Sequence, residues 1–205
     1  MKKYLNLFCA LFLIIPFFIK AQDPLWSILI YTHRNNKDDF AELYEKLQAQ
    51  IAMINAQNDI EIVYFTDDGE LSTGFKKNFL LSESLGKYIS FMSDGVQVSD
   101  TFIQLIYQVL QTNPDCVSVV SIFNQSSKNS KKFINSVNPL NKLANEAIAY
   151  KPLNELNPIK RSLIAQHTFS KVQTDDTFYW PQKVLQSPAI KIEAEVKMPS
   201  YFLKN

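Results

Sequence analysis

Residues 60–94, IEIVYFTDDGELSTGFKKNFLLSESLGKYISFMSD, contain two apolar runs that each lead into polar or acidic residues. The first run leads into Asp67 and Asp68, the second ends at Asp94, and a Lys-Lys-Asn sequence lies between them. In an open, mostly parallel sheet, ligands bind in the crevice outside the carboxyl ends of the strands. Acidic strand ends separated by a cationic segment therefore predict a phosphate-bearing ligand together with a metal ion.

Strand and helix patterns alternate on both sides of this stretch. Buried parallel strands are expected at four short apolar runs, residues 26–31, 60–65, 88–92 and 116–123. Apolar residues at three-to-four spacing predict helices between them, at residues 40–54, 75–84 and 100–111. This order predicts an α/β fold with a doubly wound, mostly parallel sheet flanked by helices.

The alternation stops after residue 123. Residues 124–138 are rich in Ser, Asn and Lys without an apolar period, which predicts a mobile surface loop. Asn157 and Pro158 are expected to open a helix, and another is expected over residues 175–185. Residues 189–196 alternate like an edge strand or a hairpin arm. Because no repeat or long linker interrupts the chain, residues 24–203 are predicted to form one domain.

Composition limits the classes of function. The chain has 205 residues, of which 46% are hydrophobic, enough for one sizeable core. A net charge of +1 gives no general attraction to nucleic acid, which is not expected as a partner. Four glycines leave no room for a Gly-rich phosphate loop. Side chains and a metal ion must therefore hold an anionic ligand.

The first 21 residues have the pattern of an export signal. Lys2 and Lys3 precede a nearly continuous apolar run over residues 4–19, and Ala21 is a suitable cleavage position. Cleavage would make the protein periplasmic or secreted. The alternative is an uncleaved N-terminal membrane anchor, and contact with the membrane is expected only in that case.

Six short segments follow one another in a particular order: 27–34 (SILIYTHR), 61–69 (EIVYFTDDG), 74–78 (GFKKN), 86–94 (GKYISFMSD), 156–161 (LNPIKR) and 174–179 (TDDTFY). The first four resemble the nucleotide-sugar half of family 2 glycosyltransferases of the GT-A fold. The last two resemble the acceptor-side segment of the same family. The resemblance extends over nearly all of residues 26–201 and implies a GT-A-like sheet with a small acceptor-side C-terminal segment.

The resemblance also implies a donor site for a nucleotide-diphospho-sugar at the strand ends. An Asp after the second strand would accept from the base or the ribose, and Lys76 would face the diphosphate or the base edge. The residues implied to line this site are Thr32, Arg34, Asp67, Asp68, Lys76, Asn78 and Ser93. The implied acceptor is a carbohydrate or a glycoconjugate, such as a surface polymer.

Departure of a nucleoside diphosphate requires its charge to be neutralised, usually by Mg²⁺ or Mn²⁺ held by a carboxylate and the diphosphate oxygens. The expected protein ligand of the metal ion is Asp94. His167 is a second candidate ligand, unless it is an ordinary histidine that binds no metal. Inversion at the anomeric carbon needs a base to take the acceptor proton, a role implied for Asp176 or Asp175. These two acids are also well placed as helix-capping residues.

The sequence departs from the family at its acidic cluster. Ser93 and Gly95 flank Asp94 where further acids are usual, and Lys77 stands in place of an arginine. An exported enzyme would also lack the cytoplasmic supply of nucleotide sugars. Two hypotheses therefore remain: an inverting, metal-dependent glycosyltransferase, or a catalytically degenerate, exported GT-A module that binds carbohydrate or nucleotide. If neither holds, residues 66–69 are an ordinary turn.

Overall fold

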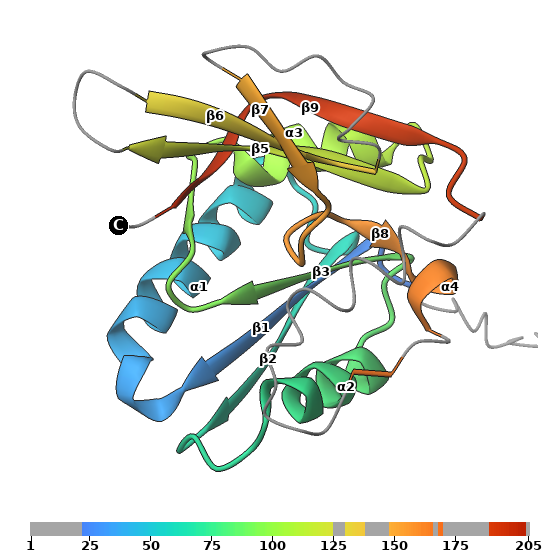
Figure 1. The fold of residues 1–205 in the computed structure, drawn as a ribbon. Helices are drawn as coiled ribbons and strands as arrows, with labels where there is room; N and C mark the ends of the chain where they lie inside the picture. Colours follow the sequence, from blue (N-terminus) through green and yellow to red (C-terminus); the bar gives the residue numbers. More distant parts are fainter. Residues whose placement is uncertain (1–21, 125–129, 138–147, 166–167, 170–188, 204–205) are drawn as a thin grey trace, which may run out of the picture.

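A computed structural model describes residues 22–124, 130–137, 148–165, 168–169 and 189–203 (Figure 1). The predicted export signal, residues 1–21, and the predicted helix at 175–185 lie outside these residues. The strands are β1 (Trp26–His33), β2 (Ile60–Asp67), β3 (Tyr88–Ser93), β4 (Gln97–Val98), β5 (Cys116–Asn124), β6 (Ser130–Ser136), β7 (Ile148–Pro152), β8 (Ile159–Lys160) and β9 (Glu193–Leu203). The helices are the 3-10 helix η1 (Arg34–Asn36), α1 (Lys37–Met53), α2 (Thr73–Glu83), α3 (Phe102–Leu110) and α4 (Arg161–Ile164).

These strands form one sheet in the order β2-β1-β3-β8-β5-β6-β7, with β9 pairing to β5 and β4. β1 lies parallel between β2 and β3, and β5 is parallel to β9. The two-residue strand β8 is antiparallel to both of its neighbours, β3 and β5. The predicted α/β fold, with a mostly parallel sheet flanked by helices, is therefore confirmed.

The two faces of the sheet bury separate hydrophobic clusters. On one face, Ile28 and Ile30 of β1 pack with residues of α1 and α3, while on the other Leu29 packs with Leu80 of α2 and Ile164 of α4. Each such fully buried aliphatic side chain contributes about 1.5–3 kcal/mol. In Figure 1, α1 and α2 accordingly lie on opposite sides of β1–β3. The carboxyl end of β1 leads directly into η1 and α1, and that of β2 into the turn before α2.

A turn and a cap set the start of α2 after β2. Gly69 has φ = 92°, a left-handed conformation that glycine adopts without steric cost. Ser72 then caps the helix, because its hydroxyl oxygen accepts from the backbone N–H of Phe75 at 3.2 Å. The cap places the Lys-Lys-Asn sequence in the first turns of α2, next to the strand ends.

The predicted loop at residues 124–138 is wrong over its described part, because β5 continues to Asn124 and β6 (Ser130–Ser136) pairs antiparallel with it over Ser130–Asn135. The polar residues of β6 have partners that are distant in sequence. Asn135, which is buried, donates to the Pro152 carbonyl at 2.8 Å and accepts from the Tyr201 hydroxyl at 3.0 Å. A polar segment can therefore form a strand when distant parts of the chain supply hydrogen-bond partners for its side chains.

The helix predicted to open at Asn157 and Pro158 is also wrong at its start. Asn157 is fully buried and donates to the Val117 carbonyl at 2.8 Å, so it anchors the chain to β5. The strand β8 follows, and α4 has only four residues. The expected strand at 189–196 begins later and extends farther, as β9. Among the described residues, no helix is both long and apolar enough to cross a membrane.

Candidate functional site

Strand register brings the predicted site residues to one edge of the sheet. Thr32 and His33 of β1 lie opposite Thr66 and Asp67 of β2. On the other side of β1, Tyr31 lies opposite Ser93, the residue that ends β3. Residues that follow β3 therefore lie beside the end of β1.

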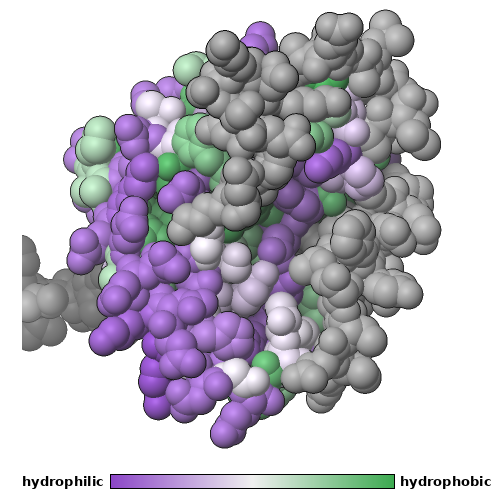
Figure 2. Space-filling view, turned by 60° about the vertical axis from the view of Figure 1, so that its left-hand side comes forward, coloured by the Kyte–Doolittle hydropathy of each residue, from purple (hydrophilic) through white to green (hydrophobic). Residues whose placement is uncertain are grey.

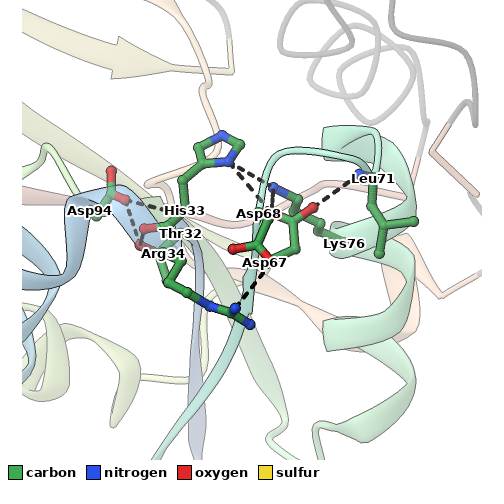
Figure 3. A network of polar contacts seen from close by, with 8 residues as sticks. All are labelled: Thr32, His33, Arg34, Asp67, Asp68, Leu71, Lys76 and Asp94. Atoms are coloured by element: carbon green, nitrogen blue, oxygen red, sulfur yellow. Dashed lines mark hydrogen bonds and ion pairs between the residues drawn. The ribbon is translucent and has the colours of Figure 1, made fainter.

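Asp94 is held at this edge by β1 (Figure 3). The Thr32 hydroxyl donates to Asp94 Oδ2 at 2.5 Å, and the backbone N–H of His33 donates to the same oxygen at 3.3 Å. Thr32 is buried, whereas Asp94 is half-buried. Among the described residues, both donors to Asp94 use Oδ2, so Oδ1 remains for a ligand.

Asp67 forms an ion pair with Lys76. Lys76 Nζ lies 2.5 Å from Asp67 Oδ1, and the backbone N–H of Leu71 donates to Oδ2 at 3.0 Å. Burial by itself raises the pKa of Asp67, but the hydrogen bonds from Lys76 and from backbone N–H groups outweigh it and lower the pKa below its ordinary value. Lys76 is only 1% exposed, so its ammonium faces Asp67 rather than solvent.

Arg34 and Asp68 form a second, exposed pair at the same edge. Their charged atoms are 3.1 Å apart, with 70% and 55% of the side chains exposed. Ion pairs this exposed contribute little to stability. Both groups can therefore turn to a ligand at small cost, unlike Lys76.

Asn78 and Ser93 lie in different surroundings. The Asn78 side chain donates to the Phe169 carbonyl at 3.0 Å and accepts from the Phe169 N–H at 2.9 Å. Asn78 therefore holds the downstream segment to α2 and does not point at the strand ends. Ser93 ends β3 as a half-buried residue directly before Asp94.

The structure adds His33 to the site, a residue to which the sequence analysis assigned no role. Its ring Nδ1 lies 3.4 Å from Asp67 Oδ1 and 3.5 Å from Lys76 Nζ, and its backbone N–H donates a hydrogen bond to Asp94. His33 thus connects the Asp67 and Asp94 parts of the site (Figure 3). Its position directly after Thr32, at a strand end, was the available signal.

Glu155 is the second residue that sequence reasoning missed. Its carboxylate lies 2.5 Å from Lys77 Nζ and accepts from the Tyr31 hydroxyl at 2.8 Å. Burial raises the pKa of Tyr31, and the nearby Glu155 carboxylate raises it further. Lys77 also packs over the rings of Tyr31 and Phe169. Lys77 therefore fixes the segment around Glu155 instead of clamping phosphate, and no local pattern in the sequence marks Glu155.

The remaining predicted residues cannot be placed in the site. Asp175, Asp176 and His167 lie outside the described residues. Within the described ranges, no three His, Cys, Asp or Glu side chains come together as a metal cluster. Asp94 would thus offer a single carboxylate oxygen, which fits Mg²⁺ or Mn²⁺ held jointly with a diphosphate, since both ions prefer oxygen ligands. It does not fit a cation held by these protein residues alone.

Comparison with solved structures identifies the fold. The structure is similar to S. aureus TarS, a GT-A family 2-like glycosyltransferase. The match to TarS 1-349 has a TM-score of 0.59 at 10% identity and covers 87% of this chain and 60% of that one. The match to TarS 1-349 in complex with UDP-GlcNAc has a TM-score of 0.57 at 11% identity and covers 88% of this chain and 58% of that one. The match to TarS 1-349 in complex with UDP has a TM-score of 0.58 at 11% identity and covers 87% of this chain and 60% of that one. No protein-family model and no curated protein matches the sequence.

This chain therefore has the fold of a GT-A glycosyltransferase. It spans 60% of the length of TarS 1-349 and 36% of a longer TarS chain. At 10–11% identity the likeness concerns the fold, and the function must be argued from the residues at the strand ends.

Proposed function

We propose that this chain transfers a sugar from a nucleotide-diphospho-sugar to a carbohydrate or glycoconjugate acceptor by a metal-assisted, inverting displacement. The observation that carries the proposal is the position of Asp94, which β1 holds at the carboxyl edge of a GT-A sheet with one oxygen left for a ligand. Ligands of open α/β sheets bind at this edge.

The donor would lie across the ends of β1 and β2. Arg34 and Asp68 are exposed there and can bind the nucleotide, while Thr32 orients Asp94. Asp67 would accept from the base or ribose only where its pair with Lys76 leaves room. TarS has been solved with UDP-GlcNAc and with UDP, which supports uridine nucleotides as the first donors to test.

Asp94 would hold Mg²⁺ or Mn²⁺ together with the donor diphosphate. The ion would neutralise the negative charge that develops on the leaving diphosphate. Because the described residues offer one carboxylate at this point, the ion is expected to bind weakly without nucleotide. His167 remains a candidate second ligand.

A catalytically degenerate binding module is the second candidate, and the surroundings of Lys76 and Asp94 favour it. Lys76, the cation expected at the diphosphate, is buried against Asp67, and Ser93 and Gly95 leave Asp94 as the only acid at its strand end. Export after cleavage at Ala21 would also separate the protein from cytoplasmic nucleotide sugars. N-terminal sequencing of the protein from its host distinguishes a cleaved signal from an anchor.

Calorimetric titration with UDP and UDP-GlcNAc, with and without Mn²⁺, tests the proposal. We expect Mn²⁺ to strengthen nucleotide binding at least about tenfold, and Mn²⁺ alone to show no comparable binding. If neither uridine nucleotide binds under any of these conditions, both a uridine-nucleotide transferase and a uridine-nucleotide-binding module are excluded.

Substitution of the acid pair separates enzyme from binding module. If Asp176 is the base, Asp176→Asn should keep donor affinity, because the base contacts the acceptor, but lower turnover by roughly 10²–10⁴-fold. Donor hydrolysis and transfer to a panel of glycan acceptors provide the rates. Asp175→Asn, measured in parallel, decides which of the two acids is the base. A wild-type chain that binds donor and shows neither reaction is a degenerate module.

A further inference from the structure

A hollow of about 280 Å³ lies on the α1 side of Asp94. Its walls come from α1, from β4 and from the end of β9, and Asp94 belongs to its lining. The side of the molecule that carries α1 comes forward in Figure 2, where the surface is largely hydrophilic with hydrophobic residues visible between the polar ones. The proposed nucleotide residues Arg34, Asp68 and Lys76 are not among its lining residues.

The floor of this hollow is apolar. Leu43 and Val98 are 4% and 2% exposed, and Phe202 adds a half-buried aromatic ring. Polar groups surround this floor, including Glu42 of α1 and Gln97 of β4, both of them exposed. An apolar base with a few polar groups around it is the usual make-up of a small-molecule site. It suits a sugar ring, whose C–H faces pack on apolar groups while its hydroxyls bond to carboxylates and amides.

The charges of the lining exclude some ligands. Three carboxylates, of Asp39, Glu42 and Asp94, face one ammonium, that of Lys46. Lys46 is itself paired with Asp100, 2.8 Å away and outside the lining. The resulting negative potential opposes phosphate and carboxylate groups and favours neutral or cationic ones. The diphosphate of a donor is therefore directed to the other side of Asp94, where the exposed Arg34 lies.

We propose that this hollow binds one sugar ring of the acceptor, either neutral or carrying an amine, and that it rejects acidic sugars. This inference rests on the proposed transferase function, because Asp94 is shared by the donor edge and the hollow and would bring the two substrates together. The volume suits a single pyranose ring. The acceptor would thus approach along α1 and β4.

Ligand-observed NMR titration of the full chain with three methyl glycosides tests this proposal. The probes are methyl β-D-glucosaminide, methyl β-D-glucoside and methyl β-D-glucuronide, which differ mainly in charge. We expect saturable binding of the first two, with the glucosaminide about threefold tighter, and at least about tenfold weaker binding of the glucuronide. Equal affinity for all three, or no saturable binding of the glucosaminide and glucoside, would overturn the proposal.

Variants locate the binding. Glu42→Gln should weaken glucosaminide binding about fivefold, the upper range for one exposed charge pair. Glu45→Gln, exposed on the same helix but outside the lining, should change nothing. Gln97→Trp should fill the hollow and abolish glycoside binding. If Gln97→Trp binds the glycosides as the wild type does, the sugar site lies elsewhere and the proposal fails.

Titration of the same proteins with UDP distinguishes failure of the sugar site in the hollow from failure of the proposed donor site. Gln97→Trp is expected to bind UDP with unchanged affinity, because Gln97 lines only the α1 side of Asp94. A chain that binds UDP but no glycoside refutes the hollow as an acceptor site and leaves the donor proposal standing. A chain that binds glycosides but no UDP refutes a UDP-sugar transferase and supports the hollow as a carbohydrate site.

Discussion

Each edge of the sheet carries an Asp–Lys pair, but only the carboxyl edge has a further acid with an oxygen left open. At the carboxyl edge, Asp67 and Lys76 lie beside Asp94, whose second oxygen has no donor among the described residues. At the amino edge, Asp115 precedes β5 and pairs with Lys160 at 2.8 Å. The residue types are the same, so composition alone does not separate the two edges.

The amino edge is closed by its own chain. Asp115 Oδ2 accepts from the backbone N–H groups of Lys191 and Ile192 at 2.8 and 2.9 Å, and Oδ1 is occupied by Lys160. Burial by itself raises the pKa of Asp115, but these partners lower it to about 2. Both oxygens are therefore occupied from within the protein.

The difference between Asp94 and Asp115 distinguishes a ligand site from a structural joint. An acid with both oxygens satisfied by the chain contributes to stability, and its loss leaves buried donors without partners. An acid with one oxygen oriented and the other open costs little to replace and is available to a ligand. Asp94 and Asp115 should therefore each respond to substitution in one property only.

The largest expected effect is that of Asp94→Asn on nucleotide binding. The variant keeps the shape of the side chain but loses the charge, so the Mn²⁺-dependent affinity for UDP should fall at least about 100-fold. The free energy of unfolding should change by less than about 1 kcal/mol. Calorimetry measures the UDP affinity, and urea unfolding measures the free energy of unfolding. Asp100→Asn, 93% exposed and outside the site, is the control, and an equal loss in both variants would rule out a special role for Asp94.

Asp115→Asn should have the reverse effect. The lowering of its pKa from 3.8 to about 2 corresponds to about 2 kcal/mol of stability at pH 7. Urea unfolding should show this loss, while UDP affinity stays within about twofold of wild type. A variant that is fully stable but binds UDP poorly would contradict the division between the two edges.

The stability difference between wild type and Asp115→Asn should depend on pH. Because folding lowers the pKa of Asp115, its contribution is complete above the ordinary pKa of 3.8 and disappears as pH falls toward about 2. By pH 3 the difference should be about half its value at pH 6. Urea unfolding at both pH values gives the two differences, and a constant difference would mean that the charge of Asp115 is not what stabilises the fold.

The smallest expected effect belongs to the exposed pair at the carboxyl edge. Arg34→Gln should change the free energy of unfolding by less than about 0.5 kcal/mol, because both partners are exposed. UDP affinity should fall, since Arg34 is free to turn to the ligand. Lys37→Gln, exposed in the first turn of α1, is the matched control for loss of a positive charge. Unchanged affinity in Arg34→Gln would confine the donor site to β2 and Asp94.

The sequence predicted the donor-side half well because its signals are local. Runs of buried residues gave β1, β2 and β3 to within two residues, and the three-to-four spacing gave α1 and α2. It failed for β6 and for the segment around Asn157, where buried polar side chains are satisfied by strands far along the chain. Pattern reasoning assigns such residues to loops because it cannot supply their partners.

The sequence by itself determined the order β1, α1, β2, α2, β3, α3 and β5, and with it the edge of the sheet at which Thr32, Asp67 and Asp94 meet. That follows because parallel strands place their carboxyl ends together whatever the details of packing. Only the tertiary structure decided what each side chain does there. It buried Lys76 against Asp67, turned Asn78 to Phe169, and brought Glu155 to Lys77. Hydrogen bonds and ion pairs require separations of about 3 Å, held to within a few tenths of an ångström, between residues remote in sequence. Spacing along the chain does not encode these separations.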